Sequence, residues 1–261
     1  MKWVIQENIE TEDGFQSFVD NIEKFGDEVV QVKVIPFIGE VIPDVDETDE
    51  PVICFGAYSM RHLALRKKFK PGVYDIEWFP YQDLILAMGD DVLNSDAVFG
   101  SFGSIIPPCD EFFMRPNHDG KEFAGVVKSA GELKEWQNRV IDLKLADNGS
   151  TLTEHTEVMC APLKKIYNEY RYFVVDNIAV TGSQYKLGSR VMYGDTDGNL
   201  DIAQSFVDKL CTHINQPYVL DVALTEDGYK IIELNTLNCA GFYAADMQKL
   251  VAALMEYQQV T

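Results

Sequence analysis

Two carboxylates and one carboxamide near the C-terminal end of the chain are of types that suit a metal ion. Asp221, Glu233 and Asn235 lie within residues 218–235, where Glu-Asp-Gly joins two apolar, β-rich runs. This pattern predicts a β-hairpin, and strand alternation then places Glu233 and Asn235 on one face. Carboxylates held close together repel each other unless a cation lies between them. Oxygen ligands of this kind suit Mg²⁺, which is usually shared with substrate phosphates.

The length of the hairpin loop decides whether Asp221 joins that face. A three-residue loop that ends at Gly228, where φ > 0 is accessible, places Asp221 opposite Glu233. A two-residue Asp227-Gly228 loop instead pairs Val222 with Glu233 and turns Asp221 to the other face. The hairpin alone therefore leaves two interpretations open. One is a metal site, and the other is a surface hairpin with solvated acids in a chain that has 42 Asp and Glu residues.

Four cations upstream of the hairpin have positions that suit phosphate binding. Arg115 ends a predicted strand, and Lys121 lies in the polar, glycine-bounded loop that follows. Arg171 shares one face of an alternating strand with Glu169, and Lys186 follows the hairpin that this strand begins. Exposed N–H groups and a point charge are what a loop needs to fold over a triphosphate. Each cation taken alone is also consistent with a solvated surface residue.

In this order the motifs resemble the ATP-grasp superfamily, and more closely its RimK-like branch of carboxylate–amine ligases. The resemblance spans roughly residues 110 to 240. Asp221, Glu233 and Asn235 match the family's Asp…Glu-x-Asn metal triad. Arg171, in Glu-Tyr-Arg-Tyr-Phe-Val-Val-Asp, matches the Arg of its Glu/Asp-x-Arg-x-Phe-Val-Val signature. The resemblance therefore implies that the triad holds Mg²⁺, or Mn²⁺ in its place.

The same resemblance implies where ATP would bind. Arg115 falls where the family usually has a Lys that reaches the α/β-phosphates, and Lys121 lies in the loop that would cover the phosphates. The stretch 159–163 looks like the interdomain hinge whose backbone would contact adenine. The residues implied for ATP binding are Arg115, Lys121, Met159, Cys160, Pro162, Leu163, Arg171 and Lys186; the last two are also implied in catalysis.

Two departures from the family pattern concern the phosphate-binding residues. Arg115 replaces the usual Lys, and the loop is poorer in glycine and carries Asp119 and Glu122. Arginine binds phosphate well in a bidentate manner but does not reproduce a lysine. These departures indicate a divergent clade.

The implied reaction joins a carboxylate to an amine. ATP would transfer its γ-phosphoryl group to a substrate carboxylate, and an amine would displace phosphate from the acyl phosphate, leaving ADP and phosphate. The substrates would be small molecules or peptides. No enzyme nucleophile is needed, in keeping with the lack of a persuasive Ser/His/Asp or Cys/His arrangement.

Two other functions are also compatible with these motifs. The first is a non-catalytic module that binds or senses a nucleotide with an ATP-grasp-like fold. The second is a nucleotidyltransferase of the RNA or DNA ligase type, whose lysine lies in Lys-x-Asp-Gly. The corresponding tetrad here, Asn117-His-Asp-Gly120, has Asn at the position of that nucleophile. Such an enzyme would release AMP, whereas the ligase would release ADP.

The elements that must position these residues alternate between strands and helices, which predicts an α/β (α+β) fold. The glycine- and serine-rich stretch 99–104 has the composition of a flexible linker. The expected domains are an N-terminal pre-ATP-grasp-like domain, 1–105, and a two-subdomain ATP-grasp domain, 106–261, with ATP between its subdomains. Besides the hairpin, the expected strands are 3–6, 29–37, 51–55, 111–115, 125–127, 157–161, 169–175 and 178–183, and the expected helices are 11–24, 60–68, 82–88, 131–139, 201–214 and 244–258.

The composition limits the partners and the compartment. A formal net charge of −20 argues against extended nucleic acid, since phosphate binding needs a basic face, but it allows a nucleotide and attracts basic amines. Five scattered cysteines and four histidines without paired spacing make a zinc site unexpected, and the thiols are expected to be buried and reduced. Without a signal-peptide pattern or a membrane-spanning apolar run, a cytoplasmic protein is expected.

Overall fold

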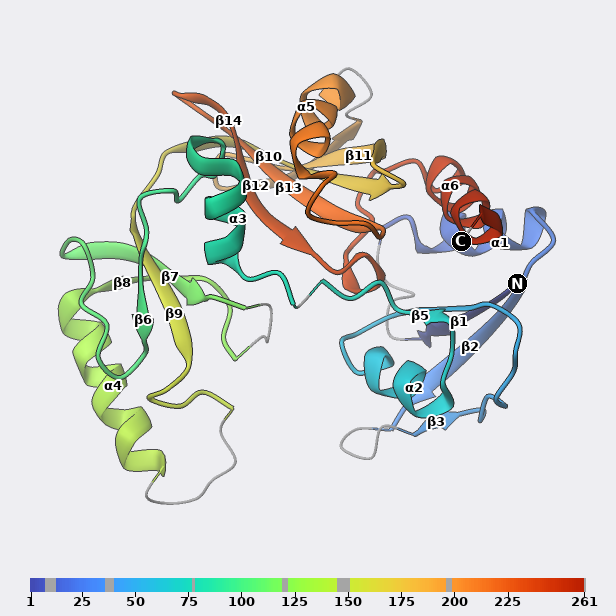
Figure 1. Cartoon of the computed structure of the whole chain (residues 1–261), viewed down its shortest axis with the longest axis horizontal. Coiled ribbons are helices and arrows are strands. Elements are labelled where there is room, and N and C mark those ends of the chain that lie inside the picture. The colour runs from blue at the N-terminus through green and yellow to red at the C-terminus, as the bar shows by residue number, and fades with distance from the viewer. Residues whose placement is uncertain are drawn as a thin grey trace. The chain divides into compact units, whose positions relative to one another are not determined.

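The computed structural model describes residues 1–7, 13–35, 40–76, 78–118, 122–144, 151–195 and 199–260 (Figure 1). The chain divides into two compact units. Unit 1 comprises Met1–Ile76, Tyr167–Leu224 and Glu233–Thr261, and unit 2 comprises Glu77–Ile166 and Thr225–Ile232. Each unit is therefore assembled from stretches that are far apart in the sequence. The assignment of domains to 1–105 and 106–261 stays a prediction.

The first sheet of unit 1 is largely parallel and is covered on both faces. Trp3 and Ile5 pack in one cluster with helices α1 (Phe15–Lys24) and α6 (Met247–Val260), which lie side by side (Figure 1). Val4, between them, packs on the opposite face with helix α2 (Met60–Lys67). Because successive side chains of a strand point to opposite faces, an unbroken apolar run such as Trp-Val-Ile suits a sheet buried on both sides. The strands are, in spatial order, β3 (Val41–Ile42), β2 (Glu28–Val34), β1 (Lys2–Gln6), β4 (Val52–Phe55) and β5 (Pro71–Gly72).

The second sheet carries the predicted metal triad and the Arg171 strand. Its second and third strands form a hairpin through Asp176 and Asn177, which both have positive φ, 50° and 59°. Helix α5 (Leu200–Leu210) contacts this hairpin. The strands are, in spatial order, β12 (Arg190–Asp195), β11 (Ile178–Leu187), β10 (Ile166–Val175), β13 (Tyr218–Thr225) and β14 (Gly228–Asn235).

Unit 2 is built on a four-stranded antiparallel sheet. Helix α4 (Ala130–Lys144) packs on it through Leu133 and Val140, and the ring of Trp136 meets Phe102 edge-on with centroids 5.0 Å apart. Helix α3 (Tyr81–Met88) and the short helix η2 (Gly89–Asp91) belong to the same unit. The strands are, in spatial order, β6 (Val98–Ser101), β9 (Glu157–Pro162), β7 (Glu111–Pro116) and β8 (Val126–Ser129).

The mixed α/β fold predicted from the sequence is confirmed, with local corrections. The prediction of a flexible linker at 99–104 is wrong for the first half of that stretch, because Val98–Ser101 forms strand β6 and pairs with β9. Strand β12 was not predicted. The expected start of the first helix at residues 11 and 12 lies outside the described residues. Within the described part of the chain, none of the helices combines the length and the apolar character needed to cross a bilayer.

Candidate active site

The three side chains of the predicted metal triad lie together in unit 1. Asp221 projects from β13 and is 1% exposed, while Glu233 and Asn235 project from β14. The carboxamide nitrogen of Asn235 donates to Asp221 Oδ2 and to Glu233 Oε1, both at 3.1 Å. The hairpin register that turned Asp221 to the opposite face is therefore wrong. Since Asn235 uses its nitrogen to join the two carboxylates, its carboxamide oxygen remains as a third oxygen for a ligand.

Arg171 forms a buried, bidentate ion pair with Asp221. Its Nε donates to Asp221 Oδ1 at 2.9 Å, and its Nη2 donates to Oδ2 at 2.8 Å. Burial raises the pKa of Asp221 above its ordinary value, and the guanidinium of Arg171 opposes this rise. Burial acts to lower the pKa of Arg171, but the carboxylate of Asp221 outweighs it and the net shift is upward. The guanidinium therefore stays charged, and its fork holds the carboxylate in one orientation.

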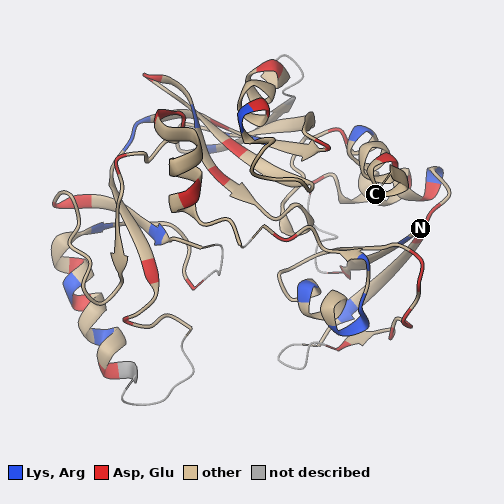
Figure 2. Ribbon diagram, in the orientation of Figure 1, with Lys and Arg blue, Asp and Glu red and all other residues tan. Residues whose placement is uncertain are grey.

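Lys186 and Glu169 form a second charged pair beside the first. Lys186 Nζ donates to Glu169 Oε1 at 2.7 Å, and the hydroxyl of Tyr185 donates to Glu169 Oε2 at 2.9 Å. Burial, followed by the nearby carboxylates, raises the pKa of Tyr185, so the hydroxyl keeps its proton. Glu169 thus orients both a cation and a hydroxyl on the strands of this sheet, where both signs of charge occur (Figure 2).

The charges of this cluster favour the binding of a cation. Asp221, Glu233 and Glu169 supply three carboxylates, and Arg171 and Lys186 supply two cations, which leaves a negative charge in excess. Among the described residues, no group of three or more His, Cys, Asp or Glu side chains is arranged to hold a metal ion. A metal at the triad would therefore use the oxygen of Asn235 and oxygens of a substrate. This donor set suits Mg²⁺, which retains water and phosphate ligands.

Two tyrosines lie against the guanidinium of Arg171, and a third tyrosine contacts one of them. The central carbon of the guanidinium lies 5.7 Å from the ring centroid of Tyr185 and 5.1 Å from that of Tyr243. The ring of Tyr243 stacks on Tyr185 at 5.2 Å and contacts Tyr193 at 5.1 Å. Tyr243 has a φ of 53°, which a bulky side chain rarely adopts. Contacts with these rings limit the motion of Arg171.

Sequence reasoning singled out none of these three tyrosines as site residues. Tyr185 was noticed only as the neighbour of Lys186, and Glu169 only as the neighbour of Arg171. The sequence offered only neighbouring positions as a signal: Tyr185 directly precedes Lys186, and Glu169 lies two residues before Arg171. The left-handed conformation of Tyr243 has no signature in the sequence, because tyrosine does not favour it.

Arg115, one of the four cations predicted to bind ATP, belongs to unit 2. Arg115 lies on β7, where its Nε donates to the carbonyl of Pro116 at 3.3 Å and its guanidinium carbon lies 5.2 Å from the ring centroid of Tyr81. Lys121 lies outside the described residues. The role of both cations in phosphate binding stays a prediction.

The stretch predicted to contact adenine, 159–163, begins within strand β9 and ends just past it. Met159 and Cys160 pair with β6 on one side and with β7 on the other, and their side chains are fully buried. The pairing with β6 ends at Cys160, so Pro162 and Leu163 lie past that pairing, and Leu163 is 45% exposed. On that side, strand β6 therefore leaves the backbone after Cys160 unpaired by its ladder. The adenine contact stays a prediction, and this geometry favours the later residues of the stretch for it.

Comparison with known proteins gives one family match and many structural matches. Residues 66–254 match the family described as ATP-grasp domain, R2K clade family 3. No curated protein matches the sequence. The solved structures with a similar fold include D-cycloserine synthetase DcsG (TM-score 0.64, 12% identity, 98% of each chain covered). They also include the ATP-grasp ligase PsnB complexed with a minimal precursor (TM-score 0.56, 13% identity, 98% of each chain). A third is the D-alanine–D-alanine ligase of Bacillus anthracis complexed with ATP (TM-score 0.60, 10% identity, 100% of this chain and 98% of that chain).

Proposed function

Because the chain belongs to the R2K clade of the ATP-grasp family, which is related to RimK, we propose that it is an ATP-dependent carboxylate–amine ligase. The family typically uses ATP and Mg²⁺ and consists of ATP-dependent ligases that form carbon–nitrogen bonds. One observation carries the proposal for this chain: Asp221, Glu233 and Asn235 meet on one face beside the bidentate Arg171. Charge stabilisation and positioning are what phosphoryl transfer requires from a protein.

The triad would hold the metal ion. Asp221 and Glu233 would contribute carboxylate oxygens, and Asn235, whose nitrogen already joins them, would contribute its oxygen. When bound, Mg²⁺ would neutralise charge on the β- and γ-phosphates. Asp221 is oriented by Arg171, so the carboxylate is held in place before any ligand binds.

Arg171 and Lys186 would balance negative charge as it moves during the reaction. A carboxylate oxygen of the substrate attacks the γ-phosphorus, and the bond to the β,γ-bridging oxygen breaks, so ADP leaves. The amine nitrogen then attacks the acyl carbon, the carbon–oxygen bond to phosphate breaks, and the amine releases a proton. Both steps place charge on phosphate oxygens, which fixed guanidinium and ammonium groups stabilise. Arg115 and Lys121 would bind the remaining phosphates, and the backbone of the stretch 159–163 would contact adenine.

The substrates we propose are amino acids or peptides. PsnB was solved with a minimal precursor, and the name of D-alanine–D-alanine ligase gives an amino acid as its substrate. A chain with a net charge of −20 attracts amines, which are protonated near neutral pH. We also propose the domain assignment 1–105 and 106–261 and a cytoplasmic location.

The test measures ATP consumption with Mg²⁺ and pools of amino acids and short peptides, and separates ADP from AMP. We expect ADP and phosphate to form only when certain pools of amino acids or peptides are present. Glu233→Gln should abolish this turnover without a change in thermal unfolding. Glu226→Gln, the same change at an exposed position of the same hairpin, should retain it. Full activity of Glu233→Gln would contradict the metal assignment, and AMP as the product would contradict the acyl-phosphate mechanism.

A second candidate function is a nucleotide-binding module without ligase activity. It is favoured by Arg115 in place of the family's usual Lys. Binding of Mg-ATP stabilises both a ligase and a binding module, so a thermal shift alone does not separate them. Saturable binding of Mg-ATP without turnover in any pool would favour this second function.

A further inference from the structure

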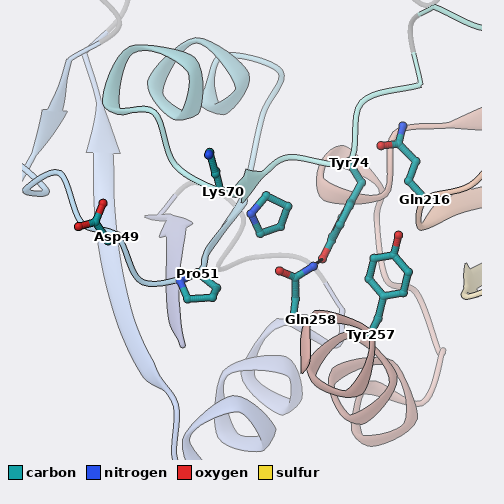
Figure 3. A pocket seen from close by; sticks show the side chains of 8 residues that line it. Asp49, Pro51, Lys70, Tyr74, Gln216, Tyr257 and Gln258 are labelled. Atoms are coloured by element: carbon teal, nitrogen blue, oxygen red, sulfur yellow. Dashed lines mark hydrogen bonds between the residues drawn. The ribbon is translucent and has the colours of Figure 1, made fainter. Parts of the chain in front are cut away.

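A cavity of about 360 Å³ opens in unit 1 and shares no residue with the candidate active site (Figure 3). Its walls come from stretches that are distant in the sequence. They include the segment before β4, the strand β5, the loop before β13 and the last turn of α6. In Figure 3 the hydroxyl of Tyr74 meets the carboxamide of Gln258 in the middle of the group, with Asp49 and Pro51 on one side and Tyr257 and Gln216 on the other. The lining residues are Asp49, Pro51, Lys70, Pro71, Tyr74, Gln216, Tyr257 and Gln258.

The polar wall of this cavity is fixed in place by contacts within the protein. Gln258 Nε2 donates to the hydroxyl of Tyr74 at 2.8 Å, and the backbone N–H of Tyr74 donates to Asn238 Oδ1 at 2.7 Å. The rings of Tyr74 and Tyr257 meet edge-on with centroids 6.0 Å apart. Gln216 Nε2 donates to the carbonyl of Asp75 at 2.5 Å. The wall therefore requires little ordering when a ligand binds.

These contacts leave specific groups for a ligand. The hydroxyl of Tyr74 accepts a hydrogen bond from Gln258, so its own proton is left to be donated. Burial raises the pKa of Tyr74, so this proton is retained at neutral pH. Gln258 uses its nitrogen on Tyr74, and its oxygen is left to accept. One donor and one acceptor thus lie side by side on the polar wall.

The rim of the cavity adds one charge of each sign. Asp49 and Lys70 are both exposed, and within the described ranges neither belongs to an ion pair. The backbone of Lys70 is fixed, since its carbonyl accepts the N–H of Val52 at 2.7 Å. A nucleotide is disfavoured, because the rim carries a single ammonium and also a carboxylate. A ligand with both an ammonium and a carboxylate complements this pair of charges.

We propose that this cavity binds a free α-amino acid as a zwitterion. The ammonium of the ligand is recognised by Asp49 and by the carboxamide oxygen of Gln258. Its carboxylate is recognised by Lys70 and by the hydroxyl of Tyr74. The two proline rings and the ring of Tyr257 supply apolar surface for the ligand's side chain. The volume lies at the lower end of the range for small-molecule sites, which suits a ligand of this size. The proposal does not depend on ligase activity.

The test is isothermal titration calorimetry of the whole chain with single amino acids of different side chains. We expect saturable binding of at least one of them. Its N-acetyl and amide derivatives should bind at least tenfold more weakly, because each lacks one of the two charges. Lys70→Gln and Asp49→Asn should each raise the dissociation constant of that amino acid at least tenfold. Both replaced side chains are exposed, so these variants retain the fold.

Three controls separate this cavity from other sites. Lys68→Gln and Asp46→Asn change exposed residues of the same charges that lie within three positions of Lys70 and Asp49 in the sequence but do not line the cavity, and they should leave the dissociation constant unchanged. Glu233→Gln, which alters the candidate active site, should also leave it unchanged. If binding is lost in Glu233→Gln but kept in Lys70→Gln, the amino acid binds at the candidate active site and the proposal is overturned. Absence of saturable binding for every amino acid overturns it as well.

Discussion

At the scale of single residues, Arg171 connects the parts of the candidate active site. Its guanidinium holds Asp221 through two hydrogen bonds, donates to the carbonyl of Gly241 at 3.5 Å and lies against Tyr185 and Tyr243. The side chain of Asp221 is only 2% exposed, so its charge has lost almost all contact with water. Such a charge is tolerated because the pairing geometry is bidentate and Asn235 supplies a further hydrogen bond. The pair therefore contributes to the fold as well as to the proposed chemistry.

Replacement of Arg171 should destabilise the protein strongly. Arg171→Met leaves a buried carboxylate without its cation, and we expect the free energy of unfolding to fall by about 3–5 kcal/mol. Arg190→Met, which changes an exposed arginine on β12, should alter it by less than about 0.5 kcal/mol. Urea unfolding monitored by tryptophan fluorescence measures both. Asp221→Asn in the Arg171→Met background should recover part of the loss, and a loss no larger than that of Arg190→Met would contradict the importance of the pair.

From the sequence, the candidate site could be predicted only for residues whose types and spacing match strand alternation or a family motif. Strand alternation placed Glu233 and Asn235 on one face, but Asp221 joined them only in one of two hairpin registers, and the resemblance to the family motif favoured that register. The pairing of Glu169 with Lys186 was not predicted, because a β-bulge interrupts the register between β10 and β11 after Glu169. The position of Tyr243 depends on a left-handed backbone conformation in a loop, which residue patterns do not specify.

At the scale of elements, the hairpin of β10 and β11 positions both Arg171 and Lys186. Asp176 and Asn177 close it with φ angles of 50° and 59°. Two consecutive positive φ angles are the mark of a type I′ turn, whose twist matches that of paired strands. Asn and Asp tolerate this conformation better than other residues with a side chain. The register of the two cations on this sheet thus depends on the chemistry of a two-residue turn.

Alanine and glycine should have opposite effects on stability in this turn and in a helix. Asn177→Ala should be less stable than Asn177→Gly by about 1 kcal/mol, because a left-handed conformation costs alanine but not glycine. At Glu135, an exposed position within helix α4, the order should reverse, with glycine less stable than alanine by about 0.5–1 kcal/mol. Thermal unfolding of the four variants measures both differences. The same order at both positions would contradict the left-handed conformation of Asn177.

Elements with strong local patterns were predicted, and those made by distant partners were not. Helix α1 was predicted from the periodic spacing of Phe15, Phe18, Val19 and Ile22, all of which are buried. Strand β6 contains glycine and serine and resembles a linker. It becomes a strand because Val98–Ser101 pairs with β9, about sixty residues further along the chain. A strand whose partner lies so far along the chain cannot be recognised from the residues around it alone.

At the scale of the whole molecule, each unit has its own hydrophobic core, and each core contains one cysteine. Cys54 belongs to a core cluster of unit 1, together with Val4 and Met60. Cys160 belongs to the core cluster of unit 2, together with Phe112 and Met114. The expectation that the thiols are buried is correct for these two and wrong for the other three, because Cys109, Cys211 and Cys239 are exposed. The two buried thiols therefore report on the packing of each unit separately.

Alkylation at pH 8 should distinguish the buried thiols from the exposed ones. Burial raises the pKa of Cys54 and of Cys160 from 9.0 to about 12. Since the thiolate is the reactive form, a raised pKa lowers reactivity at any pH below it, and on the order of one thiol in ten thousand is ionised at pH 8. We expect iodoacetamide to modify Cys109, Cys211 and Cys239 in the native protein and all five cysteines in urea, as measured by peptide mass spectrometry. Modification of Cys160 but not Cys54 under native conditions would show that the core of unit 2 opens while that of unit 1 stays closed.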